Sequence, residues 1–427
     1  MAGEWIECAL ADACRSIDYG LTASASELEF GPRFLRITDI VTGHIDWNDV
    51  PHVTADDATT AKYQLQDGDV VLARTGASTG ASAYVKNPPP AVFASYLVRL
   101  QAKPEFDARF LAYYLRSSSF WTFIRGVLGD KSAQPNASAS TMTKAPLRAP
   151  KDKNEQRAIA HILGTLDDKI ELNRRMNETL EAMARAIFKS WFVNFDPVRA
   201  KAEGRDPGLP KPLADLFPAR LVDSELGEIP EGWQVTSLDQ IARFLNGLAL
   251  QKYPPAEGRS LPVIKIAQLR AGNTDGADRA SADLQADYVV EDGDILFSWS
   301  GSLESRLWAG GPGALNQHLF KVTSSQYPSW LCHLGIHQHL DDFRHIAAGK
   351  ATTMGHIQRH HLSDAKLPIP PPQLVRAMDP VIGPVIESTW RRAVQSRTLA
   401  AVRDSLLPVL ISGALRLRDV QSAVETV

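Results

Sequence analysis

The chain has 427 residues, of which 44% are hydrophobic and 22% are charged, and its formal net charge is −3 at pH 7. This composition is ordinary for a globular protein of two or three domains. No apolar run approaches the length of a membrane-spanning helix, and the N-terminus lacks the pattern of a signal peptide. The three cysteines have no metal-ligand or disulfide-framework spacing, so we expect a reducing cytoplasm. The nearly balanced charge gives no indication of nucleic-acid binding.

Residues 1–152 carry mixed signals for short strands and helices. The segment QDGDVVLARTG, residues 66–76, places an Asp-Gly turn before an apolar run, which is typical of a strand leaving a turn. YLVRL at 96–100 predicts another strand, and 106–127 predicts one amphipathic helix. A polar loop and a strand-like APLRAP at 145–150 follow. We therefore expect residues 1–152 to form a small α/β domain.

Residues 153–196 predict a long central helix. Apolar residues recur there every three or four positions, a coiled-coil rhythm that buries one helix face against another helix. Lys169 and Asn173 interrupt the series. Residues 155–192 alone would form a rod of about 57 Å. The predicted seam consists of Ile159, Ile162, Leu166, Met176, Leu180, Met183 and Ile187.

The segment that follows, residues 197–228, is rich in proline and glycine, which excludes a long regular element. We interpret it as a linker between the two halves of the chain. A flexible tether is possible, but several apolar residues favour partial packing: Leu213, Leu216, Phe217 and Leu221.

The second half of the chain repeats the first half in the same order. EDGDILFSWSG at 291–301 corresponds to residues 66–76, an offset of 225, and the offset is 219 in the long helices. We therefore expect a second α/β domain at 229–371 and a second long helix with a C-terminal tail at 372–427. The seam of that helix is predicted to contain Val381, Val385, Leu399, Val402 and Leu406. The chain is interpreted as two diverged copies of one unit.

The sequence matches known catalytic and metal-binding motifs only incompletely. Asn87 begins an Asn-Pro-Pro-Pro run, but the aromatic residue that a base-flipping methyltransferase needs is missing, so we expect a surface turn. GASTG at 76–80 lacks the Lys-Ser/Thr of a phosphate-binding loop. A metal site is conceivable in the second domain, but without an HExxH motif or a cysteine pair we expect exposed histidines instead. These are His333, His337, His339, His345, His356, His360 and His361.

Four segments carry a family resemblance. KSWFVNFDPVRAKAEG at 189–204, followed by LVDSELGEIPEGWQV at 221–235, closely resembles the central conserved region of type I restriction–modification specificity subunits. LLPVLISGALRL at 406–417 resembles the end of their distal conserved helix. GGPGALNQHLFKV at 310–322 is similar to a segment of their target recognition domains. The resemblance covers nearly the whole chain.

The resemblance implies a mixed α/β fold in which two target recognition domains are separated by two long antiparallel coiled-coil helices, an internal pseudo-two-fold repeat. It implies a non-catalytic DNA-recognition subunit. Each domain would read one half of a bipartite site, and the helices would set the spacer and dock two methyltransferase subunits. Two restriction subunits would complete the complex. It implies no cofactor in this chain: the methyltransferase subunits would use S-adenosylmethionine, and the restriction subunits would use ATP and Mg²⁺.

For DNA contact we predict two polar loops in each domain. Arg and Lys side chains recognise guanine O6 and N7, and Asn and Gln recognise adenine N6 and N7. Ser, Thr, Asn and Gln also collect in ordinary turns, so solvated loops without DNA contact are the alternative. The predicted DNA-binding residues are Arg74, Thr75, Ser78, Thr79, Lys131, Ser132, Gln134, Asn136, Ser298, Trp299, Ser302, Lys350, Thr352, Thr353, His356, Gln358 and Arg359. For Trp299 a place in the hydrophobic core is a further alternative.

Two other classes of function remain open at this point. One is an enzyme, such as a DNA methyltransferase with a degenerate motif. The other is a coiled-coil scaffold whose repeats bind protein and do not read DNA.

Overall fold

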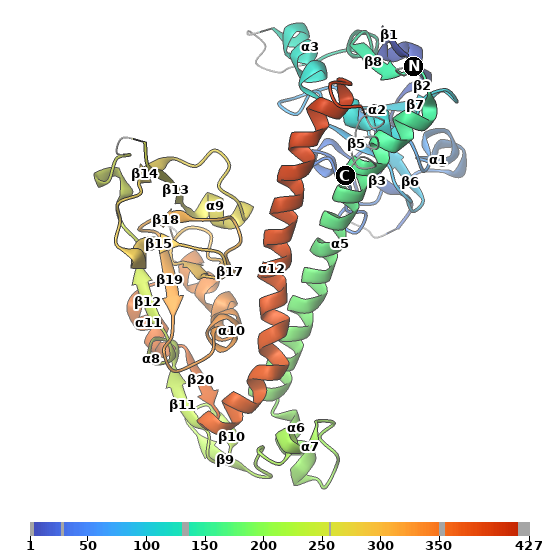
Figure 1. Ribbon diagram of the computed structural model, residues 1–427. Helices are drawn as coiled ribbons and strands as arrows, with labels where there is room; N and C mark the ends of the chain where they lie inside the picture. The colour runs from blue at the N-terminus through green and yellow to red at the C-terminus, as the bar shows by residue number, and fades with distance from the viewer. Residues whose placement is uncertain (1–3, 27–29, 130–135, 256–257, 350–354, 417–427) are drawn as a thin grey trace, which may run out of the picture. The chain divides into compact units, whose positions relative to one another are not determined.

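The computed structural model describes residues 4–26, 30–129, 136–255, 258–349 and 355–416. The chain forms two compact units, Met1–Asp168 with Leu399–Val427 and Lys169–Thr398. Two 40-residue helices, α5 (Lys153–Phe192) and α12 (Pro372–Ile411), each contribute to both units (Figure 1). Among the helices of the described part of the chain, none is long and apolar enough to span a membrane.

In the first unit a four-stranded antiparallel sheet has the order β2-β7-β4-β5. Its inner face packs on two helices, α2 and α3, through side chains such as Val70, Val98 and Phe110. The elements before α5 are β1 Trp5–Ala9, β2 Cys14–Tyr19, β3 Arg33–Leu35, α1 Asp57–Tyr63, β4 Val70–Ala73, β5 Ser82–Tyr84, β6 Ala91–Phe93, β7 Leu97–Ala102, α2 Ala108–Tyr114, α3 Ser118–Leu128, α4 Ala139–Met142 and β8 Pro146–Pro150.

The prediction of a single helix over residues 106–127 is wrong, because the chain forms two helices there, α2 and α3. Ser117 separates them: its hydroxyl accepts a hydrogen bond from the amide of Phe120 at 3.4 Å and so caps the start of α3. A serine side chain that hydrogen-bonds to the backbone in this way stabilises the start of a new helix and disfavours one continuous helix.

The second unit repeats this arrangement with a sheet of order β12-β19-β16-β17, again antiparallel. Its elements are α6 Asp196–Ala202, α7 Lys211–Ala214, β9 Leu221–Ser224, β10 Gly227–Pro230, β11 Gln234–Ser237, α8 Leu238–Ile241, β12 Arg243–Asn246, β13 Ser260–Ile264, α9 Ile266–Ala271, β14 Arg279–Ser281, β15 Val289–Val290, β16 Ile295–Ser298, β17 Ser305–Leu307, β18 Gly313–Leu315, β19 Leu319–Thr323, α10 Ser329–Ala348, α11 Arg359–Asp364 and β20 Lys366–Ile369. The equal strand orders confirm the predicted duplication.

The proline-rich segment after α5 is partly packed. Phe217 is 1% exposed and Leu213 is 6% exposed. The Phe217 ring lies edge-on to Trp191 of α5, with centroids 5.8 Å apart, and at 6.5 Å from Trp233. These contacts tie the segment to the end of α5 and to the second domain.

The two long helices pair in antiparallel fashion within each unit. In the first unit, Asp167 of α5 meets Arg403 of α12, with 2.6 Å between carboxylate oxygen and guanidinium nitrogen. In the second unit, the amide Nδ2 of Asn173 donates to Gln395 Oε1 at 2.9 Å and to Ser396 Oγ at 3.2 Å. As residue numbers increase along α5, the numbers of the contacted residues on α12 decrease. The two helices therefore run in opposite directions.

Three members of the predicted seam do not lie between the helices. Met176, Met183 and Val402 are 37%, 49% and 42% exposed, whereas Asn173, which interrupts the apolar pattern, is fully buried. The buried Asn173 and Asn177, one helical turn later, hydrogen-bond to α12. The face of α5 that carries these two residues therefore packs against α12. Ile159 is buried. The remaining seam residues, all partly buried, are Ile162, Leu166, Leu180, Ile187, Val381, Val385, Leu399 and Leu406.

Each globular domain meets its own long helix at a glycine. In the first unit the Arg109 guanidinium lies on Gly164, donates to its carbonyl at 3.0 Å and pairs with Asp168 at 2.8 Å. A Cβ on Gly164 would stand 2.3 Å from that guanidinium carbon. In the second unit the corresponding glycine, Gly383, lies beside Trp330 of α10. The repeat therefore preserves the place at which domain and helix touch.

Asp167 joins three elements of the first unit. Its carboxylate accepts hydrogen bonds from Tyr113 of α2 at 2.6 Å, from Arg116 just after α2 at 2.8 Å, and from Arg403 of α12. Burial raises the pKa of Asp167, but Arg116, Tyr113 and Arg403 together outweigh burial and hold that pKa below its usual value. The ionised carboxylate is thus the stable form in the folded protein.

We predict that Asp167→Asn lowers the free energy of unfolding by about 2 kcal/mol, because two partly buried arginines lose their counterion. Urea unfolding of the full chain, followed by tryptophan fluorescence, measures the change. Asp404→Asn is the matched control, since Asp404 also pairs with Arg403 but is 61% exposed. That control should change stability by no more than about 0.5 kcal/mol. Equal effects of both variants would contradict the role assigned to Asp167.

Candidate nucleic-acid interface

In the first domain the two predicted loops meet. The loop after β4 contains Arg74 and Thr75, and the segment before α4 begins at Asn136. Thr75 and Asn136 form an isolated antiparallel bridge, and the amide of Ala137 donates to the Arg74 carbonyl at 3.0 Å. Residues 61 positions apart in the sequence are thereby fixed side by side. We call this contact the first loop junction.

Arg74 is held in place at the first loop junction. Its guanidinium lies over the Tyr19 ring, 5.0 Å from the centroid, and Nη2 lies 3.5 Å from Asn136 Oδ1. Its Nε is buried and has no hydrogen-bond partner among the described residues. Tyr19 itself is 45% exposed, and its hydroxyl accepts from the Ala139 amide at 2.9 Å. The arrangement presents a preorganised cation beside an exposed ring, which suits a base edge or a phosphate.

In the second domain the equivalent loops meet in the same way. Ser300, after β16, forms an isolated antiparallel bridge with His356. The amide of Gly301 donates to the Gly355 carbonyl at 2.8 Å, and that of Ile357 donates to the Trp299 carbonyl at 2.9 Å. This contact is the second loop junction. The offset of 225 found in the sequence places Ser300 at the position of Thr75.

The second loop junction has different side chains. Trp299 occupies the position of Arg74, is partly buried, and donates from Nε1 to Asn246 Oδ1 at 3.0 Å and to the Gln317 carbonyl at 3.1 Å. The Trp299 ring lies 5.7 Å from His318, and His318 Nδ1 is 3.0 Å from Ser300 Oγ. The second domain therefore has an aromatic surface where the first domain has an arginine.

The predicted DNA-binding residues divide into three groups. Thr79 and Ser298 are 2% and 0% exposed, so these two cannot contact DNA as folded, and their hydroxyls bond to the carbonyls of Gly76 and Ser302. Partly or fully exposed are Arg74, Thr75, Ser78, Asn136, Trp299, Ser302, His356, Gln358 and Arg359. The remaining six lie outside the described residues: Lys131, Ser132, Gln134, Lys350, Thr352 and Thr353.

Sequence reasoning missed three residues of the junctions. Tyr19, Asn246 and His318 come from β2, from β12 and from the turn before β19, far from the predicted loops. The signal that was available is the GGPGALNQHLFKV segment, which contains His318. Its polar Asn-Gln-His run before a strand fits a surface turn that could have been included.

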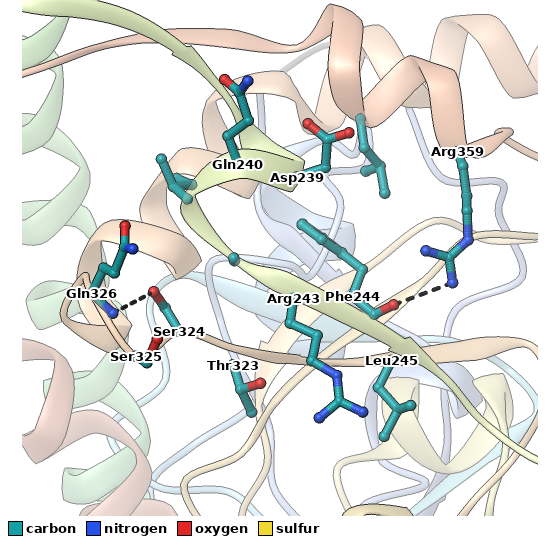
Figure 2. Close-up of a pocket in the computed structure, with 13 residues that line it drawn as sticks. Asp239, Gln240, Arg243, Phe244, Leu245, Thr323, Ser324, Ser325, Gln326 and Arg359 are labelled. Carbon is teal, nitrogen blue, oxygen red and sulfur yellow. Dashed lines mark hydrogen bonds between the residues drawn. The ribbon is translucent and has the colours of Figure 1, made fainter.

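A groove with a volume of about 730 Å³ runs along β12 and is bordered by Arg359. Its lining includes the strand β12, the turn at 323–326 and Arg359. Arg359 donates from Nη2 to the Phe244 carbonyl at 3.4 Å, and its guanidinium lies 5.7 Å from the Phe320 ring. Figure 2 shows Arg243 on one side of this strand, with Phe244 and Arg359 on the other.

The prediction of exposed histidines is wrong for His333, His337 and His339 of α10, whereas His345 on the same helix is exposed as predicted. His333 is 7% exposed, and its ring is 4.5 Å from that of His337. Burial lowers the pKa of His333, His337 and His339, to about 4 for His337. His337 Nε2 lies 3.1 Å from the Ser305 carbonyl, which requires a proton on that nitrogen. Within the described ranges, no group of three or more His, Cys, Asp or Glu side chains could hold a metal ion.

Comparison with known proteins identifies the family. The type I restriction modification DNA specificity domain matches this chain twice, at residues 4–182 and 230–382. The chain belongs to this family of type I DNA specificity subunits. The two matched regions contain the first and second loop junctions, one in each.

Similar proteins cover nearly the whole chain. The HindI specificity subunit of Haemophilus influenzae is 23% identical over 96% of this chain and all of its own. The MjaIX specificity subunit of Methanocaldococcus jannaschii is 25% identical over 73% of this chain and 70% of its own. The crystal structure of the type I S subunit from M. genitalium has a TM-score of 0.57 at 14% identity, covering 96% of both chains. That structure supports the fold.

The specificity subunit should lose stability in mild acid because of its buried histidines. Their pKa values lie below the ordinary 6.5, so under acid conditions the unfolded chain binds protons that the folded chain does not. The contribution of these neutral histidines to the free energy of unfolding is therefore fully present at neutral pH, and it is lost as the pH drops from about 6.5 towards 4. The measurement is the free energy of unfolding against pH. His337→Gln should flatten the curve in this window, whereas replacing His345, which is exposed on the same helix, should not. A flat curve for the unmodified chain would refute the assignment.

Proposed function

We propose that the two loop junctions are the surfaces with which this DNA-recognition subunit reads its bipartite sequence. The observation that carries the proposal is the duplicated junction: in each specificity domain, two polar loops distant in sequence are held together by backbone hydrogen bonds. Base reading requires polar side chains on a rigid frame, because a frame that moves cannot discriminate one groove edge from another. Each domain reads one half-site.

In the first half-site, Arg74 is the residue best suited to a guanine. A guanidinium that is already oriented by Tyr19 and Asn136 loses little conformational freedom when it binds O6 and N7. In the second half-site, Trp299 is engaged with Asn246 and Gln317, so His356, Gln358 and Ser302 are the contacts offered to bases. The two halves of the recognised sequence are thus read by different chemistry.

An exposed apolar stripe on α5 supports docking of a methyltransferase subunit. Leu172, Met176 and Met183 are 51%, 37% and 49% exposed, and their spacing of four and seven residues places them on one helix face. Large apolar side chains in a row on a helix are typical of a protein-binding surface. Val402 of α12, at the repeat position of Met183, is 42% exposed, which supports a second docking surface.

These surfaces support the assembly of a complete complex. Two methyltransferase subunits dock on the long helices, and two restriction subunits join them in the cytoplasm. The long helices set the spacer between the half-sites. The methyltransferase subunits supply S-adenosylmethionine chemistry and the restriction subunits use ATP and Mg²⁺, while this subunit contributes sequence recognition.

We predict that Arg74→Ala relaxes recognition at one position of the first half-site, by about 1–3 kcal/mol of discrimination. The second half-site and the spacer should persist, because the second domain and both helices are unaltered. The measurement is genome-wide mapping of methylated adenines in cells that carry the variant complex.

Arg125→Ala is the control for that experiment, since Arg125 is an exposed arginine of the same domain, outside the first loop junction. It should leave the methylated sequence unchanged. If Arg74→Ala altered both half-sites, the two domains would read DNA jointly and the two-reader proposal would fail.

A second prediction concerns docking. Met183→Asp should weaken binding of the methyltransferase subunit at least roughly tenfold, because the interface would bury an unpaired charge. Ala182→Asp introduces the same charge on the exposed flank of α5, beside the stripe, and should have a smaller effect. Pull-down of purified methyltransferase subunit measures both. Normal binding by Met183→Asp would show that the stripe is not the docking surface.

A further inference from the structure

The groove along β12 has the features of an oxyanion site. Two guanidinium groups, Arg243 and Arg359, flank β12 from opposite sides (Figure 2). Three hydroxyl or amide side chains of the turn before α10 complete the lining: Ser324, Ser325 and Gln326. The lining also contains one carboxylate, Asp239, which accepts hydrogen bonds from Ser237 and Ser363. Figure 2 shows Asp239 on the side of the strand away from Arg243.

Backbone donors face the same groove. Among the strands of the described residues, β12 is an edge strand and pairs with β19 alone. The Gly247 amide donates to Leu319 of β19, so alternate residues, Phe244 and Asn246, direct their backbone groups to the open edge. The bond from Arg359 to the Phe244 carbonyl agrees with this direction. The Phe244 N–H therefore points to the same open edge as its carbonyl, to which Arg359 donates.

The groove and the second loop junction share two segments of the chain, β12 and residues 356–359. Arg359 follows His356 and Gln358 in the chain, and Asn246, the last residue of β12, accepts a hydrogen bond from Trp299. A ligand that occupies the junction with its bases would pass its backbone along β12. Arginine pairs, hydroxyls and backbone N–H groups are the donors that proteins use for phosphodiester oxygens.

We infer that this groove binds phosphodiester groups of the DNA backbone next to the second half-site, an inference that rests on the proposed function. Arg243 is the principal contact. It is 63% exposed, and its ion pair with Asp287, at 3.0 Å and 57% exposed, is weak enough to exchange for a phosphate. The first domain has an exposed arginine at the same repeat position: Arg15 lies on β2, which is also a sheet edge.

The test uses the assembled complex of this chain with the methyltransferase subunits. Its affinity for DNA is measured as a function of salt concentration, for DNA that contains the recognised site and for DNA that lacks it. Arg243→Gln should bind both DNAs more weakly, by about eightfold at 0.1 M salt, and lower the salt slope by about 0.9. The recognised sequence should not change, because phosphate contacts carry no base information. Asp287→Asn should bind both DNAs more tightly, since it frees Arg243.

The exposed ion pair between Arg220 and Glu231 provides matched controls, because both side chains lie outside the groove. Arg220→Gln and Glu231→Gln should leave affinity and salt slope unchanged.

An unchanged affinity and slope in Arg243→Gln would overturn the inference. So would a changed recognised sequence, which would make Arg243 a base reader, or a loss of methyltransferase binding, which would make the groove a protein-docking surface. In each case sequence-specific binding by the unmodified complex leaves the proposed function standing. Absence of specific binding by the unmodified complex would refute that function itself.

Discussion

One carboxylate connects the first domain to both long helices. Asp167 accepts from Tyr113 and Arg116 of the domain and from Arg403 of the other helix, so one ionised group fixes three elements. Charge-assisted hydrogen bonds of this kind are directional, which apolar contacts are not. The burial of Ile159 and Leu163 nearby supplies stability, while Asp167 specifies how the elements meet.

The second unit holds its domain to the long helix through different polar contacts. The repeat position of Asp167 is Ile386, which is buried, and two separate polar contacts hold the domain to α12 instead. Arg397 forms a bidentate pair with Asp292, and Trp330 donates to Asp379 at 2.8 Å. Arg397 lowers the pKa of Asp292, which keeps that carboxylate ionised. The duplication therefore preserved strand order and the glycine contact, and it replaced the polar groups around them.

Much of the architecture was predictable because it depends on patterns repeated within the chain. The Asp-Gly turn before β4 and β16, the long helices and the order of elements are all visible twice. The face of α5 that turns inward was not predictable from apolar spacing, because Asn173 and Asn177 make their contacts with α12 through hydrogen bonds. An asparagine in an apolar series is ambiguous in sequence: it either interrupts a seam or specifies its register. Here it lies at the centre of the helix contact.

The contact between the two polar loops of each candidate interface was predictable only in part, and the limit has a physical cause. Polar loops can be recognised from composition, but the partners that order them come from distant strands, as Tyr19 orders Arg74 and Asn246 orders Trp299. Burial also separates neighbours, so that Ser302 is exposed while Ser298 is not.

The hydrogen bonds that join the two loops at each junction connect main-chain atoms, so they form whatever side chains are present. Side chains at the junctions can therefore change, as Arg74 and Trp299 illustrate, while the frame that presents them stays the same. Under the proposed function, a domain built in this way can acquire a new half-site by substitution within the loops. Its fold and its contact with the long helices impose no requirement on the bases it reads.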